Sequence, residues 1–353
     1  MEDLARDYDV LVRVGGPNAG HTVSSASGVY TYHHLPSGAR DTKAKLLLGP
    51  GITINVKRLL EEIAECGVTP DRLFIDPQAM IIEPEDSVRE KELVAQIAST
   101  GQGSGSALAR RILGRRPGAI RLARDIPELE SFVGSGPLYR GSTHRQLETA
   151  YRKGCSILLE GTQGSGLSLY HGQHPHVTSR DTNVAGCLAE AGISPSRVRR
   201  ILMVVRPTPI RVGNPDGTAG YTSGGLKHET DFETVATAAK LDPVEVKGYE
   251  KTSTTIRARR VGWFEWDQFR QACALNAPSD IVLTFADYLD GKNRQARRFE
   301  QLAEDTIKFI EELERIAQAP VSLINTRFPR SADEKIDLRT VIDRRNWTTR
   351  RTS

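Results

Sequence analysis

The sequence predicts an α/β fold with a large, mostly parallel central sheet that is flanked by helices. Short apolar runs alternate with segments of helical periodicity along most of the chain, which is the pattern of consecutive strand–helix units. Polar loops rich in glycine and threonine follow several of these runs, and parallel sheets place their ligands at such loops. The 353 residues and the hydrophobic content of 38% suffice for a sizeable core.

The predicted elements follow from these periodicities in chain order. A helix end over 1–6 precedes the first strand, and Asn55 is suited to cap the first full helix. The predicted strands are the apolar runs 8–14, 45–48, 72–76, 156–160, 199–206, 280–284 and 320–324. The predicted helices are 55–66, 88–98, 143–153, 228–240, 264–275 and 296–317. No long linker divides them, so we expect one domain over 1–343 and a polar tail over 344–353.

Composition restricts the class of protein. The net charge of +4 is slight for this length, and the basic cluster over 110–116 is local, so nucleic acid is not an expected partner. The four cysteines are far apart, with no spacing typical of a zinc site or a disulfide framework. No apolar run approaches the ~18 residues that span a bilayer. We therefore expect a cytoplasmic protein that is not inserted in a membrane.

The first candidate loop is GGPNAGHT at 15–22, which directly follows the first predicted strand. Its glycines allow the backbone to approach a ligand closely. Asn18 offers an amide, and His21 can act as an acid or a base near neutral pH. The alternative interpretation is a tight turn with a surface histidine.

Two further loops are suited to anions. STGQGSG at 99–105 opens a helix, where free backbone N–H groups and the helix dipole favour negative charge; a flexible linker is the alternative. TSTTIRARR at 252–260 sets arginines behind a run of hydroxyls. Guanidinium groups bind carboxylate or phosphate in a bidentate way, although a solvated edge strand has a similar composition.

The last two loops follow apolar runs. EGTQGSG at 160–166, with the polar stretch 171–182 behind it, carries more amides and hydroxyls than core packing explains, so we expect it to contact a ligand. The nearby histidines 171, 174 and 176 suggest a metal site, but no carboxylate or cysteine accompanies them. Asp287 follows the run 280–284 and is suited either to accept hydrogen bonds from a purine or to cap a helix.

Taken together, these loops resemble the adenylosuccinate synthetase family, in the family's order, from about residue 3 to about residue 330. The motifs that carry the resemblance are NAGHT at 18–22, LPSG at 35–38, EGTQG at 160–164, HPHVTS at 174–179, and TT-R-RR at 254–260 followed by VGW. The resemblance implies a P-loop-related α/β fold and a ligase reaction. A triphosphate phosphorylates O6 of a 6-oxopurine nucleotide with the help of Mg²⁺, because this oxygen is otherwise a poor leaving group, and the amine of L-aspartate then displaces the phosphate.

The resemblance also implies roles for individual residues. His21 and Gln163 would be catalytic, with His21 as the general acid that steadies the transferring phosphoryl group, and the Gly20 carbonyl would help to hold Mg²⁺. The residues for the purine nucleotide would be Asn18, Thr100, Arg110, Gln163 and Thr178, with Arg110 donated across the interface of a homodimer. Those for aspartate would be Thr254, Thr255, Arg257 and Arg259. Those for the triphosphate would be His21, Thr22, Arg259, Asp287, Asn325, Thr326 and Arg327.

The sequence departs from the family pattern in four places. The opening strand and the GDEGKGK-like loop, which supply an Asp base, a magnesium ligand and a Lys, have no counterpart before the first predicted strand. A general base typically contributes about 10²–10⁴ in rate, so we expect the chain as written to be impaired, by a truncated start or in a degraded relative. The loop before Arg110 is shorter than usual, Ile256 replaces a glycine, and Phe285 replaces a Lys that pairs with guanine O6 in the common bacterial form.

These departures favour the phage-type branch of the family, which makes 2-aminodeoxyadenylosuccinate from dGMP, aspartate and ATP for DNA that contains diaminopurine. Such an enzyme would work in the host cytoplasm. The housekeeping reaction of IMP, aspartate and GTP, which leads to AMP, is the alternative. A nucleotide-binding relative without catalysis is an alternative of another class.

Overall fold

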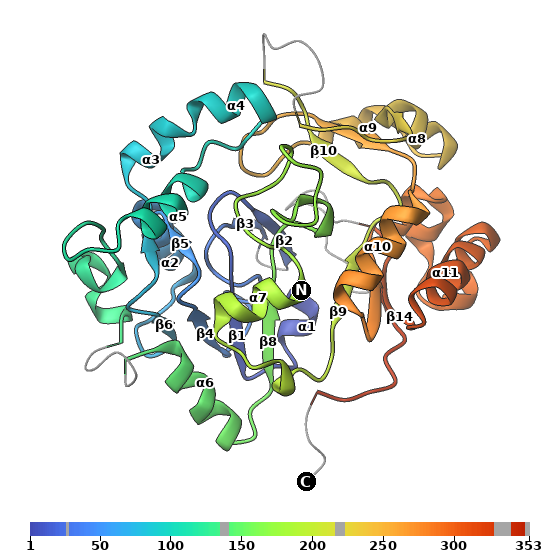
Figure 1. Cartoon of the computed structure of the whole chain (residues 1–353). Helices are drawn as coiled ribbons and strands as arrows, with labels where there is room; N and C mark the ends of the chain where they lie inside the picture. The colour runs from blue at the N-terminus through green and yellow to red at the C-terminus, as the bar shows by residue number, and fades with distance from the viewer. Residues whose placement is uncertain (26–27, 135–140, 216–222, 328–339, 350–353) are drawn as a thin grey trace. The chain divides into compact units, whose positions relative to one another are not determined.

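The structure is a computed structural model that describes residues 1–25, 28–134, 141–215, 223–327 and 340–349 (Figure 1). The chain forms two compact units. The first unit comprises Met1–Val23, Tyr30–Arg197 and the end of the chain from Thr348, and the second comprises Ser24–Val29 and Val198–Trp347. Each unit contains parallel strands covered by helices, which confirms the predicted α/β class.

The sheet of the first unit has four parallel strands in the order β6-β4-β1-β8. They are β1 (Val10–Arg13), β4 (Lys45–Leu48), β6 (Leu73–Ile75) and β8 (Ile157–Glu160). All four lie within predicted apolar runs. Helices cover both faces of the sheet, and β1 is buried throughout, whereas β8 is only partly buried before Glu160. In the register of β1 with β8, Arg13 lies opposite Glu160 at the carboxyl ends of the two strands.

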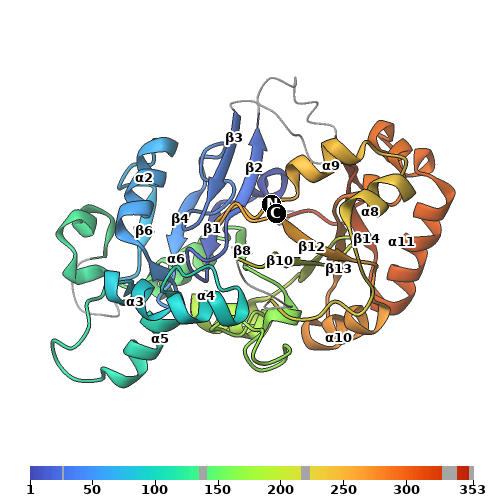
Figure 2. The same cartoon turned by 90° about the horizontal axis from the view of Figure 1, so that it is seen from above.

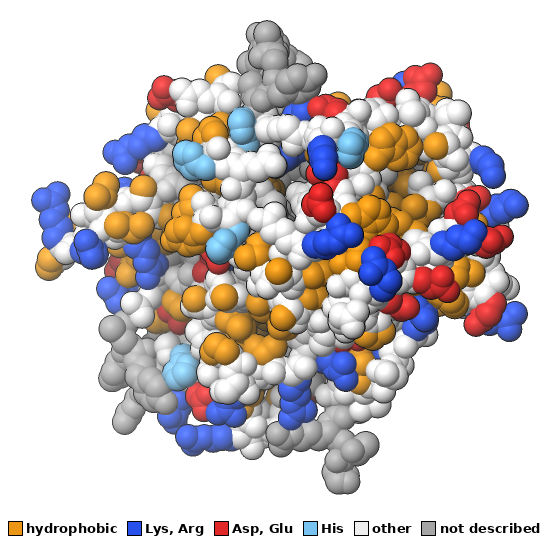
Figure 3. All heavy atoms as spheres, turned by 45° about the vertical axis from the view of Figure 1, so that its right-hand side comes forward, with side chains coloured by type: hydrophobic (Ala, Val, Ile, Leu, Met, Phe, Trp, Pro, Cys, Tyr) orange, Lys and Arg blue, Asp and Glu red, His pale blue; other side chains and the backbone are white. Residues whose placement is uncertain are grey.

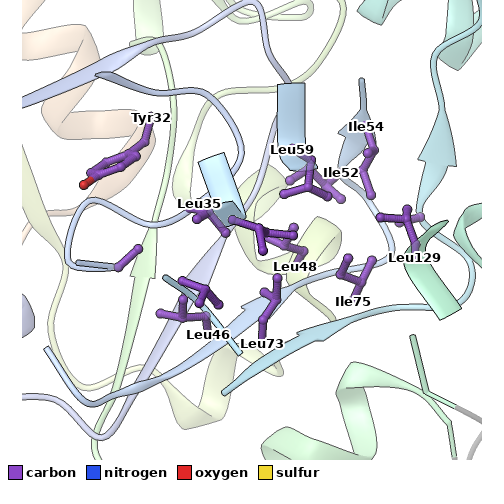
Figure 4. Close-up of a cluster of buried hydrophobic side chains, with 14 of the residues drawn as sticks. Tyr32, Leu35, Leu46, Leu48, Ile52, Ile54, Leu59, Leu73, Ile75 and Leu129 are labelled. Atoms are coloured by element: carbon purple, nitrogen blue, oxygen red, sulfur yellow. The ribbon is translucent and has the colours of Figure 1, made fainter. Parts of the chain in front are cut away.

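Alternate residues of these strands point to opposite faces of the sheet. Leu46 and Leu48 pack with Leu59 of helix α2 (Val56–Cys66) in the cluster of Figure 4, and Leu11 belongs to the same cluster. The intervening residues form a second cluster with helices α6 (Thr143–Arg152) and α7 (Val184–Ala191), which comprises Val10, Val12, Leu47, Leu147 and Ala191. Figure 2 shows the strands between these layers. As predicted, Asn55 caps α2, since its side chain accepts the N–H of Arg58 at 3.1 Å.

The predicted helix 88–98 is two helices, α3 (Pro84–Arg89) and α4 (Lys91–Ile97). The first begins earlier than predicted, because Pro84 occupies its first turn and Asp86 accepts the N–H of Glu83. The other short elements of this part of the chain are α1 (Glu2–Ala5), β2 (His21–Ser25), β3 (Gly28–Tyr32), β5 (Thr53–Ile54), β7 (Met80–Ile81), α5 (Ser104–Leu113), η1 (Ala123–Asp125), η2 (Pro127–Phe132), η3 (Ser165–Leu167) and η4 (Pro195–Arg197).

The second unit contains a four-stranded sheet in the order β15-β14-β13-β9, in which only β15 is antiparallel. Its strands are β9 (Leu202–Val205), β13 (Asp280–Leu283), β14 (Val321–Asn325) and β15 (Val341–Asp343). A second, antiparallel sheet of β10 (Ile210–Val212), β12 (Arg259–Gly262) and β11 (Glu229–Thr230) carries part of the predicted arginine loop.

The helices of the second unit cover these sheets. They are α8 (Phe232–Ala238), α9 (Pro243–Tyr249), α10 (Trp266–Asn276) and α11 (Glu304–Ala317), with the short turns η5 (Ala286–Tyr288), η6 (Gly291–Gln295) and η7 (Phe299–Gln301). The predicted helix 228–240 begins only at Phe232, because Asp231 caps it and the two residues before Asp231 join β11. The predicted helix 296–317 begins at Glu304.

Acidic and basic side chains are interspersed on the face that Figure 3 presents, in accord with the slight net charge of +4. In the described parts of the chain, no helix has the length and apolar character needed to cross a membrane. The four cysteines are free thiols.

Candidate active site

His21 lies against a buried ion pair at the carboxyl ends of two neighbouring strands. Nη1 of Arg13, at the end of β1, donates to Oε1 of Glu160, at the end of β8, at 2.8 Å. His21 begins β2, and its Nδ1 contacts the same carboxylate oxygen. Ser37 donates its backbone N–H at 2.8 Å and its hydroxyl at 2.6 Å to the Glu160 carboxylate. This carboxylate therefore fixes the edge of the His21 ring that faces the protein.

The same contact sets the tautomer of His21. Nδ1 of His21 also lies 3.0 Å from Nη1 of Arg13, which can only donate. The contact with the Glu160 carboxylate is the shorter of the two, and a carboxylate only accepts, so Nδ1 carries a proton toward Glu160 and Nε2 is left for a ligand. Burial and the charge of Arg13 lower the pKa of His21, against the opposing effect of Glu160. Burial raises the pKa of Glu160, but Arg13 and His21 outweigh it and hold this pKa well below its ordinary value of 4.5. His21 is thus neutral near pH 7, and a bound polyanion would raise its pKa.

Arg13 is a site residue that sequence reasoning missed. Its side chain is fully buried, and its Nη2 also donates to the carbonyl of Ala19 at 3.0 Å, within the NAGHT motif. A single arginine at the end of an apolar run is typical of a strand that ends at the surface. Its role becomes visible only through its partner Glu160, which lies 147 residues further along the chain.

Asn18 and Thr178, both predicted to hold the nucleotide, come together in the first unit. Nδ2 of Asn18 donates to Oγ1 of Thr178 at 3.3 Å. Gly16 lets the backbone of this loop lie close to Thr53 and Ser104. A Cβ at Gly16 would lie 2.2 Å from Oγ1 of Thr53 and 2.9 Å from Oγ of Ser104. Oδ1 of Asn18 and Oγ of Ser104 are buried without a hydrogen-bond partner. Buried polar atoms are normally paired, so this group of atoms is suited to a polar ligand.

Gln163 follows β8 in a strained backbone conformation with φ of +60°. A left-handed conformation costs a residue other than glycine about 1–2 kcal/mol, and such strain is concentrated at functional sites. Its Oε1 accepts the hydroxyl of Thr162 at 2.9 Å. The first glycine-rich loop meets this one directly, because a Cβ on Gly15 would lie 2.4 Å from the Thr162 hydroxyl oxygen.

The loop before helix α5 is held by a carboxylate from the chain itself. Glu90 is buried and accepts the N–H groups of Gly103 at 2.8 Å and Gly105 at 2.7 Å. The anion at this helix N-terminus is therefore Glu90, where the sequence suggested a ligand. Thr100 lies in the same loop, and its carbonyl accepts Nε2 of Gln102 at 3.1 Å.

Arg110 on α5 is bound within its own chain. Its Nη2 donates to Oδ2 of Asp86 at 2.6 Å and to the carbonyl of Ile81 at 2.9 Å. The side chain is 19% exposed. Its predicted role across a dimer interface stays a prediction, and this role requires Arg110 to share or leave Asp86.

In the second unit, Arg259 belongs to a buried charge cluster around Glu250. Oε2 of Glu250 accepts Nη1 of Arg259 at 2.9 Å, and Oε1 accepts Nη2 of Arg206 at 2.9 Å and the hydroxyl of Tyr288 at 2.7 Å. Burial raises the pKa of Glu250, but the two arginines outweigh it and lower this pKa below 4.5. The cluster joins the predicted aspartate loop to the residues that follow strand β13.

The loop predicted to bind aspartate, 252–260, begins with a compact turn. Oγ1 of Thr252 lies 2.7 Å from Oγ1 of Thr255 and accepts the N–H of Arg257 at 3.0 Å. Burial lowers the pKa of Arg257. Ile256 has φ of +57°, which explains why a glycine suits this position in the family pattern. Thr254 lies in the same turn.

Phe285 and Asp287 follow strand β13, where the sequence places the base of the triphosphate. The guanidinium of Arg206 lies 4.4 Å from the centroid of the Phe285 ring. Oδ2 of Asp287, which is fully buried, accepts Nε of Arg294 at 3.1 Å. Phe285 and Tyr288 pack ring against ring, with centroids 5.3 Å apart. The aromatic pair and the carboxylate together are suited to a flat, hydrogen-bonding ligand.

The predicted triphosphate residues Asn325, Thr326 and Arg327 lie at the end of strand β14 and directly beyond it. Thr326 is buried, and its N–H and hydroxyl donate to the carbonyl of Thr340 at 2.8 Å and 3.0 Å. Asn325 is the last residue of β14. Arg327 is the last described residue before the gap at 328–339.

The predicted site residues thus fall into two groups. Those of the first unit are Asn18, Gly20, His21, Thr22, Thr100, Arg110, Gln163 and Thr178. Those of the second unit are Thr254, Thr255, Arg257, Arg259, Asp287, Asn325, Thr326 and Arg327. Thr22 lies on β2, with its hydroxyl 3.0 Å from that of Thr31. The structure brings together His21 with Glu160, and Asn18 with Thr178, whereas the other roles depend on ligands.

The chemistry that these groups allow is phosphoryl transfer with nucleotide and carboxylate recognition. The first unit offers a histidine with one free ring nitrogen beside hydroxyl and amide groups. The second offers arginines, threonine hydroxyls and an aromatic pair beside a carboxylate. A catalyst of phosphoryl transfer needs such groups mainly for positioning and for charge stabilisation.

Comparison with known proteins agrees with this chemistry. The family model described as adenylosuccinate synthetase matches residues 1–132 and 126–295. The adenylosuccinate synthetase of Methanocaldococcus jannaschii is 32% identical over 323 residues, which cover 90% of this chain and 86% of the relative. That of Thermococcus onnurineus is 33% identical over 350 residues, which cover 97% and 92%.

Two solved structures are similar. The succinoaminodeoxyadenylate synthetase of cyanophage S-2L, bound to dGMP and to dATP as an energy donor, has a TM-score of 0.69 and 26% identity, and the match covers 91% of this chain and 85% of that one. The fully ligated adenylosuccinate synthetase of Plasmodium falciparum shares the fold, with a TM-score of 0.77 and 22% identity over 97% and 95% of the two chains. The chain therefore belongs to the adenylosuccinate synthetase family of carbon–nitrogen ligases.

Proposed function

We propose that this ligase joins L-aspartate to C6 of dGMP, with ATP as the phosphoryl donor, and so makes 2-aminodeoxyadenylosuccinate for DNA that contains diaminopurine. The observation that carries the proposal is Phe285. The apolar ring occupies the position of the lysine that pairs with guanine O6 in the common bacterial form of the family, a lysine that some archaeal members also lack. A guanine would lose a donor here, whereas adenine requires none at that atom.

The surroundings of Phe285 support this choice. The guanidinium of Arg206 lies 4.4 Å from the centroid of the Phe285 ring and donates to Glu250 at 2.9 Å. The similar phage enzyme, whose structure holds dGMP and dATP, uses an adenine nucleotide as its energy donor. The curated archaeal relatives are adenylosuccinate synthetases, so the reaction of IMP with GTP is the alternative.

We assign the steps of the reaction to residues as follows. Asn18 and Thr178 hold the purine nucleotide, and Gln163 contacts the oxygen at C6. Nε2 of His21 gains a proton when the polyanion binds, and donates it to the transferring phosphoryl group while Glu160 stabilises the charged ring. The aspartate loop, with Arg257 as a carboxylate ligand, binds the amino acid whose amine displaces the phosphate.

Magnesium fits this assignment as a ligand brought in with the triphosphate. Mg²⁺ is usually held by one or two protein oxygens, by substrate phosphates and by water. The described ranges contain no group of three or more His, Cys, Asp or Glu side chains arranged to hold a metal ion, and the Glu160 carboxylate is already engaged. The Gly20 carbonyl would supply a protein oxygen. The ion would neutralise charge on the β- and γ-phosphates.

We also infer a homodimer in the cytoplasm, or in the host cytoplasm if a phage encodes the chain. Apolar side chains are exposed near Arg110, with Val88 59%, Ile112 62% and Leu113 85% exposed. Such residues are suited to a subunit interface. Light scattering at several concentrations tests the oligomeric state, and a monomer at all of them would contradict the dimer.

The substrates are tested with two reaction mixtures, dGMP with ATP and IMP with GTP, each with aspartate. Product is identified by mass spectrometry, and phosphate release is followed in parallel. We expect turnover in the first mixture, slowed by about 10²–10⁴ because the counterpart of the Asp base is missing, and turnover only in the second would contradict the proposal. Thermal stabilisation by nucleotides without phosphate release in either mixture would favour the non-catalytic alternative.

The variant Phe285→Lys tests the observation that carries the proposal. A lysine there restores the donor for guanine O6, so the preference for ATP over GTP should fall by at least about tenfold, since a hydrogen bond to a charged group contributes about 1.5–3 kcal/mol. Tyr249→Phe, on the exposed side of α9, is the matched control and should leave the preference unchanged.

A further inference from the structure

Arg180 is a buried arginine behind the Gln163 loop to which neither the sequence motifs nor the proposed reaction gives a role. It is 7% exposed, and its Nε donates to Oε1 of Glu190 at 2.5 Å. The other oxygen of Glu190 accepts the N–H of Gly15 at 3.1 Å. The pair thus ties the beginning of the GGPNAGHT loop to the segment that follows Thr178.

The guanidinium of Arg180 also contacts Thr162 and Gln163. Nη1 of Arg180 donates to Oγ1 of Thr162 at 3.1 Å and to the backbone carbonyl of Thr162 at 3.3 Å. It lies 3.5 Å from Oε1 of Gln163 as well. Arg180 therefore holds the Thr162 carbonyl, directly before the strained residue Gln163, and also contacts the side chain of Gln163.

The chemistry of these groups decides which of them donate hydrogen bonds and which accept. Arginine can only donate, and a hydroxyl has a single hydrogen. Because the Thr162 oxygen accepts from Arg180, its hydrogen is available for Oε1 of Gln163, which it reaches at 2.9 Å. The amide of Gln163 therefore points its oxygen inward, and a flipped amide would direct its NH₂ group at Arg180. Its NH₂ group is left to face a ligand.

We propose that Arg180 and Glu190 form a positioning pair that, through Thr162, makes Gln163 a hydrogen-bond donor, so that the site selects purine nucleotides with an acceptor at C6. A 6-oxopurine presents an oxygen that accepts from Gln163. A 6-aminopurine presents an NH₂ group, which meets another donor and leaves both unpaired. This inference rests on the proposed function, because it requires Gln163 to face C6 of the nucleotide.

The test compares the affinities for a 6-oxopurine nucleotide, the tighter of dGMP and IMP, and for dAMP, by titration calorimetry. Thr162→Val removes the hydroxyl but leaves the ion pair, and Arg180→Met with Glu190→Gln removes both charges together. In each we expect the ratio of the two affinities to fall at least about tenfold. Thr162→Ser keeps the hydroxyl and should retain the ratio. Arg197→Met is the matched control, since Arg197 pairs with Glu148 at 3.5 Å and is 46% exposed.

The outcomes separate the inference from the proposed function. If the natural chain prefers the 6-oxopurine and the Thr162→Val chain keeps the full ratio, or loses both affinities equally, the positioning role is overturned and the proposed function stands. If the natural chain shows no preference for the 6-oxopurine, the proposed function fails, and the inference fails with it.

Discussion

Replacing Glu160 by glutamine removes one charge from the centre of the first unit. Glu160 is 4% exposed and its partner Arg13 is fully buried, so the change leaves an uncompensated buried guanidinium. Removing one partner of a buried ion pair typically costs about 3–5 kcal/mol. Arg13, His21 and Ser37 all donate hydrogen bonds to the Glu160 carboxylate. The NH₂ group of a glutamine would face some of these donors and could not accept from them. We therefore expect the free energy of unfolding to fall by about 3–5 kcal/mol.

The assay is urea unfolding at pH 7 of the natural chain and of Glu160→Gln. Glu148→Gln is the control, because Glu148 pairs with Arg197 at 3.5 Å at the surface, where such a pair contributes at most about 1 kcal/mol. A loss for Glu160→Gln no larger than that of the control would refute the reasoning, because it would mean that Arg13 is solvated or paired elsewhere.

The same pair gives a pH dependence with a definite sign. The pKa of Glu160 in the folded chain lies well below its ordinary value of 4.5. Its contribution to stability is therefore fully present above about pH 4.5 and is lost as the pH falls toward the folded pKa. The free energy of unfolding of the natural chain should fall as the pH is lowered through this range. The free energy of unfolding of Glu160→Gln should fall less over the same range. Equal acid dependence of the two chains would contradict the pairing.

Three further substitutions test other parts of the site. Asn18→Ala removes the amide beside Thr178, so the affinity for the purine nucleotide should fall about tenfold while that for the triphosphate stays unchanged in calorimetry; an equal loss of both would count against the assignment. Glu250→Gln weakens the ion pair that holds Arg259. The KM for aspartate should then rise about tenfold with little change in kcat, and an unchanged KM would oppose the role of Arg259 in binding aspartate. Ile256→Gly relieves a left-handed β-branched residue that is 67% exposed, and urea unfolding should show a gain between zero and about 1 kcal/mol, so that a clear loss would contradict the strain.

Most of the strands were predictable from the sequence because their burial on both faces requires continuous apolar runs. The helix starts were less predictable. Asn55 is a strong cap and was found, whereas Pro84 begins a helix before the apolar periodicity becomes visible. The β10-β12-β11 sheet was missed because two- to four-residue antiparallel strands carry little alternation.

The site was predictable where a motif is contiguous, as for His21, and unpredictable where the partner is distant. Arg13 and Glu160 depend on a parallel pairing 147 residues apart, which no local pattern reveals. The Gly-rich start of α5 was linked to an anionic ligand, but the sequence could not show that Glu90, between α3 and α4, supplies a carboxylate there. Arg180 is inconspicuous in its motif, and only its hydrogen bonds indicate a function.

The proposed reaction requires that the oxygen at C6 of the purine nucleotide leaves as phosphate. It is tested by giving the enzyme dGMP labelled with ¹⁸O at C6, together with ATP and aspartate, and by analysing the released phosphate by mass spectrometry. We expect one ¹⁸O atom in each phosphate, with loss of the label from the succinylated nucleotide. Phosphate that is free of ¹⁸O while the label stays in the nucleotide or enters water would contradict it.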